Sequence, residues 1–240
     1  MHTIALVSRK GGTGKSTLAI GMAIAAVADG HKVCLLEADP LGTLSNWRRR
    51  RVEPEPTVET VHDGYELARR VPFLAHCGVT LTITDTAGGW SDTATAAIGA
   101  ADLCLIPVRP SPADIEAAVP TLAAIRERGK PFAFVLNQTP ARSARLEGAA
   151  ASLGETAASL HVTGVLALPT IVLRNDPQDA LGKGLAVTEY AHEGKSADEI
   201  RGLWQWVWGR LTSLAPQDAQ LPSQTAASPA NEETELRAVG

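Results

Sequence analysis

Short apolar runs recur along the chain, and longer stretches between them carry apolar residues at helical spacing. The runs predict strands at Thr3–Ser8, Lys32–Ala38, Val79–Thr84, Asp102–Val108, Phe132–Asn137 and Thr163–Leu168. The first, second and fourth runs are almost continuously apolar, which is typical of strands covered by helices on both faces. The pattern therefore favours a buried parallel sheet over a sheet with one face in water.

The longer stretches predict helices at Lys15–Asp29, Leu41–Arg50, Tyr65–His76, Thr93–Ala100, Pro112–Arg128, Ala141–Leu160 and Ser196–Leu214. Ser111 before Pro112 places a cap residue ahead of a proline in the first turn, and Ser196 with Glu199 has the spacing of a capping box. Strands that alternate with helices through short links predict a three-layer α/β fold, with a mostly parallel twisted sheet between helices.

The last predicted helix carries a single apolar stripe, formed by Ile200, Leu203, Trp204, Val207, Trp208, Leu211 and Leu214. Such a stripe is more typical of a core face than of a membrane face. Trp206 lies off the stripe, on the side of Arg210, and is either a partner contact or an incidental surface residue. From Ala215 the composition shifts to Gln, Pro, Ser, Ala, Glu and Thr, so we predict one domain over residues 1–214 and a disordered acidic tail over 215–240.

Composition and charge change this picture little. Hydrophobic residues make up 45% of the chain and charged residues 20%, as in ordinary globular proteins, and the net charge of -4 argues against a general nucleic-acid coat. Cys34, Cys77 and Cys104 lack metal-ligand spacing, and Cys34 and Cys104 lie in apolar runs, which favours buried thiols in a reducing compartment. Neither a signal peptide nor an apolar stretch of membrane length is visible, so we expect a cytoplasmic protein.

Candidate chemistry is concentrated in the link between the first strand and the first helix, Arg9-Lys10-Gly11-Gly12-Thr13-Gly14-Lys15-Ser16-Thr17. Glycines allow a tight loop whose backbone N–H groups surround an anion, and the following helix N-terminus adds partial positive charge. Lys15 supplies a charge to the outer phosphates, and Ser16 a hydroxyl to Mg²⁺. The strict pattern G-x-x-x-x-G-K-[ST] is not met, because Arg9 occupies the first glycine position and a second lysine, Lys10, precedes the glycines.

The segment K-G-G-T-G-K-S-T resembles the deviant Walker A motif of the ParA/MinD ATPase superfamily. The resemblance implies a P-loop NTPase fold that binds ATP and Mg²⁺, with a phosphate site formed by Lys10, Gly11, Gly12, Thr13, Gly14, Lys15, Ser16 and Thr17. It also implies that Lys10 crosses a dimer interface to touch the partner's nucleotide. The residues alone leave a second reading open, in which Lys10 is a solvated loop charge.

The segment E-A-D-P-L-G resembles the family's D-x-D-P-Q-G segment, although Glu37 and Leu41 replace the usual aspartate and glutamine. By this resemblance, Asp39 positions the water that attacks the γ-phosphate and supports the hydrated Mg²⁺. The alternative is that Asp39 caps a helix. The Glu37 side chain is longer than that of the usual aspartate, which leaves the role of this residue open.

Two later segments extend the resemblance, which covers about residues 2–212. In L-T-I-T-D-T-A-G-G-W, Asp85 resembles the Walker B aspartate that holds Mg²⁺ through water, and Thr86–Gly89 resembles a loop that senses the γ-phosphate. Asn137 resembles the residue that reads the adenine edge, with a turn-forming asparagine as the alternative. The segment after the last strand implies a nucleotide contact near Pro169.

The resemblance is greatest to small ParA-type partition ATPases without an N-terminal helix-turn-helix domain. It implies an ATP-dependent homodimer with weak ATPase activity that binds nucleoid DNA non-specifically. A ParB-like or cargo-adaptor protein would stimulate hydrolysis, and the cycle would position a plasmid, chromosome or protein cargo. The basic residues considered for DNA are Arg48–Arg51, Arg142, Arg145, Lys183, Lys195, Arg201 and Arg210. Two alternatives stay open: a MinD-like positioning ATPase at the membrane, which the acidic tail disfavours, and a metabolic P-loop enzyme.

Overall fold

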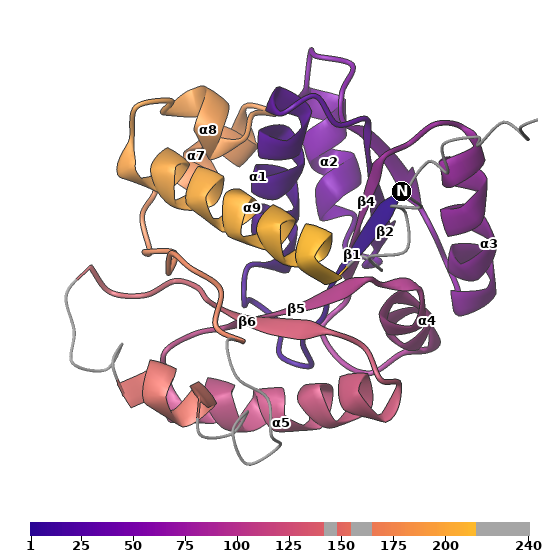
Figure 1. Ribbon diagram of the computed structural model, residues 1–240. Coiled ribbons are helices and arrows are strands. Elements are labelled where there is room, and N and C mark those ends of the chain that lie inside the picture. Colours follow the sequence, from indigo (N-terminus) through magenta and orange to yellow (C-terminus); the bar gives the residue numbers. More distant parts are fainter. Residues whose placement is uncertain (142–147, 155–164, 215–240) are drawn as a thin grey trace, which may run out of the picture.

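A six-stranded sheet forms the centre of the computed structural model, which describes residues 1–141, 148–154 and 165–214 (Figure 1). The strands lie in the order β3-β2-β4-β1-β5-β6, and every pairing between neighbours is parallel. Their bounds are β1 His2–Leu6, β2 Val33–Ala38, β3 Thr57–Thr60, β4 Leu81–Thr86, β5 Leu103–Val108 and β6 Phe132–Leu136. Because all six strands run the same way, their carboxyl ends meet at one edge of the sheet.

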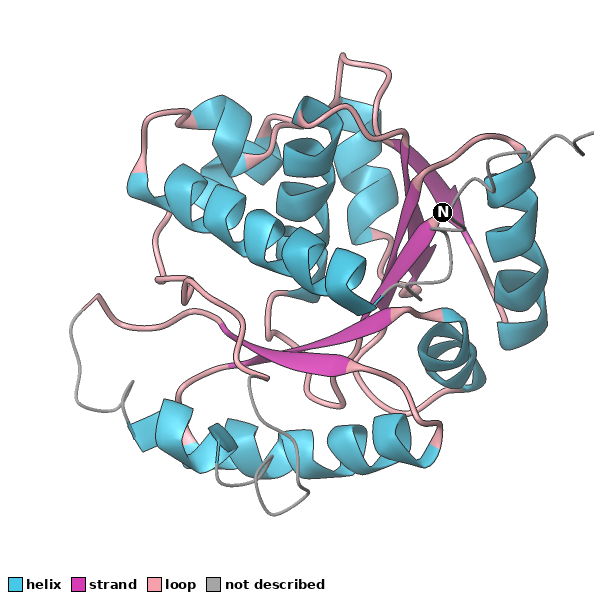
Figure 2. Ribbon diagram, viewed as in Figure 1, coloured by secondary structure: helices cyan, strands magenta, loops and turns pink. Residues whose placement is uncertain are grey.

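Helices cover both faces of the sheet, which gives the three layers seen in Figure 2. One face packs against α1 Lys15–Ala28, α2 Thr43–Arg50, α8 Val187–Tyr190 and α9 Lys195–Leu214, and the short helix α7 Asp176–Gly182 lies on the same side. The other face packs against α3 Gly64–His76, α4 Asp92–Ala100 and α5 Pro112–Glu127, and residues 148–154 are also helical. The predicted fold class is confirmed.

Alternation along each strand divides the core between the two faces. In β1, Ile4 and Leu6 enter the core beneath α1 and α9, whereas Ala5 and the next residue, Val7, enter the core beneath α4 and α5. All four side chains are buried. Because both sides of each central strand are covered, the strands read as continuously apolar in the sequence.

Five of the six predicted strands are confirmed to within a few residues, and the sixth lies only partly within the described residues. Thr163–Leu168 contributes only an isolated bridge between Leu166 and Phe134 in the part that the structure describes. Strand β3 and helices α7 and α8 were not predicted. Most of the predicted helix Ala141–Leu160 lies outside the described residues, as does the predicted tail over 215–240.

The two predicted helix caps have opposite outcomes. Ser111 caps α5 by accepting a hydrogen bond from the Asp114 N–H at 3.2 Å, as predicted. The capping box at Ser196 and Glu199 is wrong, because α9 begins at Lys195 and Ser196 is buried inside it. Glu199 instead receives two hydrogen bonds of 2.8 Å from the Arg174 guanidinium. This ion pair ties the segment before α7 to α9.

The apolar stripe of α9 is confirmed as mostly a core face. Its buried members are Ile200, Leu203, Trp204, Val207 and Leu211. Trp206 and Trp208 are partly buried and pack against the same core, so Trp206 is not the exposed contact considered from the sequence. None of the helices in the described ranges combines the length and apolar character needed to cross a membrane.

Candidate nucleotide-binding site

The glycine-rich link forms a loop between β1 and α1 at the carboxyl edge of the sheet. Gly12 and Gly14 have φ angles of 75° and 89°, in the left-handed region that glycine adopts without strain. A Cβ on Gly14 would lie 2.3 Å from Nδ2 of Asn137, so a side chain cannot be accommodated there. Gly14 caps α1 without any side-chain hydrogen bond, which leaves the first N–H groups of the helix free for an anion.

Two amides at the end of β6 hold this loop in place. The Asn137 Nδ2 group donates to the Thr13 carbonyl at 2.7 Å, and the Gln138 Nε2 group donates to the Gly12 carbonyl at 3.0 Å. The Asn137 Oδ1 atom accepts from the backbone N–H of Gln138 at 2.9 Å. The Asn137 side chain therefore braces the phosphate loop, a role that sequence reasoning missed, and its contact with adenine stays a prediction.

Lys15 and Asp85 are both buried beneath the loop, close enough for the charge of each to shift the pKa of the other. Asp85 is fully buried on β4, in register with Leu6 of β1 and Glu37 of β2. Burial raises the pKa of Asp85 to about 7, although the Ser16 hydroxyl and the Lys15 ammonium oppose the shift. Burial likewise lowers the pKa of Lys15, while the charges of Asp85 and Asp39 raise it.

The Asp85 carboxylate is a fitting part of a Mg²⁺ site. Neither of its oxygen atoms accepts a hydrogen bond of ordinary geometry from the described residues, although both are buried. A buried carboxylate without donors needs a cation or water to balance its desolvation. Mg²⁺ is usually bound by one or two carboxylates together with substrate phosphates, so a single buried carboxylate beside a phosphate loop fits such a site.

The two acids at the end of β2 have different structural roles. Glu37 is buried and accepts hydrogen bonds from the N–H groups of Leu44 at 2.6 Å and Ser45 at 3.2 Å, so it caps α2 from outside the helix. Asp39 is half-buried and accepts only from the Leu41 N–H, at 3.0 Å, among the described residues. The capping function thus belongs to Glu37, and Asp39 keeps a carboxylate oxygen for other contacts.

The Lys10 ammonium group pairs with a residue of α5 and not with its own loop. The Nζ atom lies 3.1 Å from Oδ2 of Asp114, a buried residue in the first turn of α5. Burial by itself raises the pKa of Asp114, but Ser111, Arg109 and Lys10 together hold it below its usual value. About a third of the Lys10 side chain is exposed, so the ammonium lies at the surface of the site.

The loop after β4 packs directly against the phosphate loop. A Cβ on Gly88 would lie 3.1 Å from the backbone of Gly11, closer than most side-chain contacts, which favours glycine here. Two large apolar side chains flank the same edge: Trp90 is 47% exposed and Leu41 is 79% exposed. Sequence reasoning noted Leu41 only as a departure from a motif and gave Trp90 no role.

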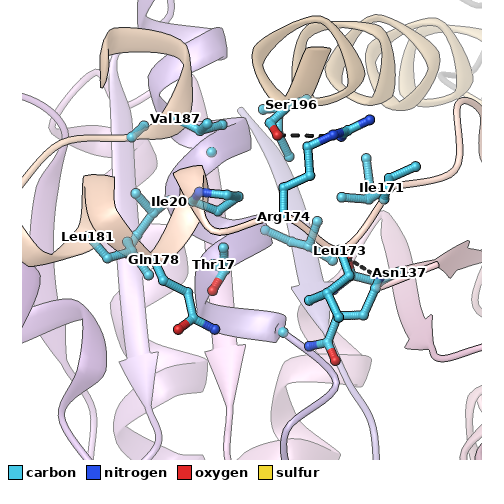
Figure 3. Close-up of a pocket in the computed structure, with 18 residues that line it drawn as sticks. Thr17, Ile20, Asn137, Ile171, Leu173, Arg174, Gln178, Leu181, Val187 and Ser196 are labelled. Carbon is cyan, nitrogen blue, oxygen red and sulfur yellow. Dashed lines mark hydrogen bonds between the residues drawn. The ribbon is translucent and has the colours of Figure 1, made fainter. Parts of the chain in front are cut away.

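A cavity of about 60 Å³ lies beside the loop, between the first turns of α1, the segment 171–174 and α7 (Figure 3). Its lining includes Gly14, Thr17 and Asn137, three residues predicted from the sequence. Pro169 is not among the described residues that line it, because its ring packs against Gly202 of α9. Residues 171–174, a few positions further along the chain, line the cavity, and the nucleotide contact near Pro169 stays a prediction.

The arginine run at the end of α2 is not a uniform basic patch. Arg51 is buried and forms hydrogen bonds of 2.8 and 2.9 Å with the Glu189 carboxylate. Arg48 and Arg50 donate to backbone carbonyls, and Arg49 donates to the Asn46 side chain. Arg51 thus joins α2 to α8, whereas the other three have no carboxylate partner among the described residues.

A comparison of the sequence with family models points to the same kind of site as the glycine-rich loop, the buried Lys15 and Asp85, and Lys10. The model for the CobQ/CobB/MinD/ParA nucleotide binding domain matches residues 4–186. The chain belongs to this family. Because the match includes the glycine-rich loop, this loop lies in a nucleotide-binding domain. The ParA and MinD members of the family are ATPases.

Individual relatives extend the likeness over different lengths. Protein virC1 of Rhizobium radiobacter is 29% identical over 50% of this chain, and the match spans only 54% of that relative. Maintenance of carboxysome distribution protein A of Halothiobacillus neapolitanus is 29% identical over 82% of this chain and 92% of its own length. The solved structure of Cyanthece apo McdA covers 86% of this chain and 99% of its own, with a TM-score of 0.72 at 19% identity, and shows the shared fold.

Proposed function

We propose that this chain is an ATPase that dimerises when it binds ATP, binds DNA non-specifically as the dimer, and positions a plasmid, chromosome or protein cargo. The observation that carries the proposal is the placement of the two lysines. Lys15 is buried beside Asp85, where outer phosphates and Mg²⁺ would lie, whereas Lys10 is held outside the loop by Asp114. A lysine that its own loop does not use is available to a second subunit.

The nucleotide and metal are supported by structures that share the fold. A Cyanothece McdA(D38A) structure is a complex with ATP, and a MinD structure from Pyrococcus horikoshii is a complex with Mg-ADP, at TM-scores of 0.67 and 0.66. The names of the curated relatives refer to carboxysome distribution and to ParA. For this chain, ATP, Mg²⁺ and the positioning role are part of the proposal.

The proposed reaction assigns one task to each charged side chain of the site. Lys15 and the free N–H groups of α1 bind the outer phosphates. The Ser16 hydroxyl and the Asp85 carboxylate would hold Mg²⁺, which would neutralise charge on the phosphate oxygens. Asp39 orients the water whose oxygen attacks the γ-phosphorus, so that the bond to the β-phosphate oxygen breaks and ADP and phosphate form. Lys10 would leave Asp114 and bind the partner's phosphates.

The DNA surface is proposed at the end of α2. Arg48, Arg49 and Arg50 carry charges that no described carboxylate neutralises. A dimer would present this surface twice, and the affinity for phosphates increases with each charge that is neutralised. Arg51 is left out, because Glu189 already neutralises it.

A DNA mobility assay in Mg²⁺ tests this function. We expect a shift with ATP and little or none with ADP or without nucleotide. Arg49→Gln should weaken the ATP-dependent shift and reduce its salt dependence, whereas Arg128→Gln, at the end of α5 on the opposite helical layer, should not. Equal shifts in all nucleotide states, or none in any, contradict the proposal. ATP-dependent sedimentation with anionic vesicles in place of DNA would instead support the membrane alternative.

A further inference from the structure

The cavity beside the phosphate loop contains one side-chain amide that forms no hydrogen bond within the described residues. This amide belongs to Gln178 on α7, whose backbone N–H bonds to the Asn175 carbonyl while its side chain is exposed. Figure 3 shows the Gln178 side chain extending from α7 beside Thr17, the residue of α1 that follows the phosphate loop. The free amide thus lies on the wall of the cavity next to the proposed phosphate site.

The other nitrogen-bearing side chains of the cavity are already engaged. Asn137 and Gln138 bind the carbonyls of the phosphate loop, as described above. Arg174 is held by both carboxylate oxygens of Glu199 and by the Ser196 hydroxyl. These groups line the cavity, and each would have to break a hydrogen bond before its nitrogen atoms could turn toward a ligand.

We propose that Gln178 reads the N6/N7 edge of the base of the bound nucleotide and selects adenine over guanine. This inference rests on the proposed function, because it takes the phosphates to lie on the glycine-rich loop. From there the ribose and base would extend along α1 into the cavity, where Thr17 and Gln178 lie.

The chemistry of the amide fits the N6/N7 edge of adenine. An amide offers one acceptor and one donor side by side, so its oxygen accepts from the N6 amino group while its nitrogen donates to N7. Guanine presents two acceptors, O6 and N7, on the same edge. A single amide can satisfy only one of them and leaves its own oxygen without a donor.

Binding assays with three triphosphates test the assignment in the full chain. The ligands are Mg·ATP, Mg·GTP and Mg·7-deaza-ATP, in which a C–H group replaces N7. The variants are Gln178→Leu, Gln178→Glu, which keeps an acceptor for N6 but lacks the donor for N7, and Asp179→Asn. Asp179 is the matched control, because it is the next residue of α7, is exposed, and does not line the cavity.

For the wild-type chain and for Asp179→Asn, we expect 7-deaza-ATP to bind roughly three- to tenfold more weakly than ATP, and GTP more weakly still. Gln178→Leu and Gln178→Glu should bind ATP and 7-deaza-ATP equally. The inference is overturned if the wild-type chain binds ATP and 7-deaza-ATP equally, or if the two Gln178 variants still bind ATP more tightly than 7-deaza-ATP. Should the wild-type chain bind no triphosphate at all, the proposed function itself fails. If Gln178→Glu still binds ADP, the variant is folded. Its loss of discrimination between ATP and 7-deaza-ATP is then not caused by unfolding.

Discussion

At the residue scale, the two lysines of the loop differ in their surroundings more than in their sequence context. Lys15 is buried, and the charges of Asp85 and Asp39 only partly offset the burial that lowers its pKa. Lys10 lies at the surface and pairs with Asp114 on α5. The motif predicted both lysines as site residues, but it could not predict the Asp114 contact, because that partner comes from a helix far away in the sequence.

We predict that Asp114→Asn strengthens ATP-dependent dimerisation. Removing the carboxylate frees Lys10, and an ion pair with one partly exposed partner is worth up to about 1 kcal/mol per subunit. Because both subunits of the dimer give up this pair, the dimer Kd should fall by at most about thirtyfold. Arg109→Gln is the matched control, because it removes the competing partner of Asp114 and leaves the Lys10 contact in place. Analytical ultracentrifugation in a non-hydrolysable ATP analogue measures both constants. A weaker dimer in Asp114→Asn than in Arg109→Gln contradicts the prediction.

Asp85 makes the nucleotide-free protein sensitive to pH. Its folded pKa of about 7 lies above its ordinary value of 3.8, so the folded state holds a proton that the unfolded chain releases. Stability should therefore fall as the pH rises from about 4 to 7. Asp85→Asn removes this loss and should raise the free energy of unfolding at pH 8 by up to about 4 kcal/mol, and by less at pH 5.

Urea unfolding at the two pH values measures this effect without nucleotide. Glu127→Gln, at an exposed position in α5, serves as the control and should change little at either pH. A stabilisation by Asp85→Asn that is the same at pH 5 and pH 8 would show that the carboxyl group does not titrate in this range.

At the element scale, the sequence was most informative where burial is complete. Strands β1, β2, β4, β5 and β6 are covered on both faces and read as apolar runs. Strand β3 was missed because it is a four-residue edge strand whose side chains are exposed or half-buried. Its order in the sheet depends on pairing with β2, which short polar sequences do not signal. Helices α7 and α8 are too short for helical spacing to be recognised.

The capping box at Ser196 failed for a related reason. Its residue types match the pattern, but Glu199 accepts hydrogen bonds from the Arg174 guanidinium and the Val172 N–H instead of capping α9. Local sequence could not reveal this tertiary ion pair. Conversely, the sequence left the role of Glu37 open, and the structure shows that it caps α2.

We predict that Glu37→Gln destabilises the protein by about 1–2 kcal/mol, because it removes a charged acceptor from the N-terminus of α2. Glu59→Gln, which breaks a partly exposed pair with Arg70, should cost at most about 1 kcal/mol. Chemical denaturation of the two variants at pH 7 measures the difference. An equal or smaller loss in Glu37→Gln would show that the cap contributes little.

At the scale of the whole molecule, the order of the parallel strands brings the site together. β4 and β1 lie side by side at the centre of the sheet, so Asp85 comes to lie beneath the loop that follows β1, with Asp39 after β2 on the far side of β4. The same edge exposes Lys10, Leu41 and Trp90 at the surface of the site. We infer that a second subunit covers this edge when ATP is bound.

The most direct test of this account is the mass of the protein in solution with nucleotide. Sedimentation velocity should be measured for the wild-type chain and for Lys10→Gln, with Mg²⁺ and either ADP or a non-hydrolysable ATP analogue, alongside binding of a fluorescent ATP analogue. We predict that the wild-type chain is a monomer with ADP and a dimer with the analogue, and that Lys10→Gln binds the analogue but stays a monomer. A Lys10→Gln dimer as tight as the wild type, or a wild-type chain that binds the analogue and stays a monomer, would contradict the account.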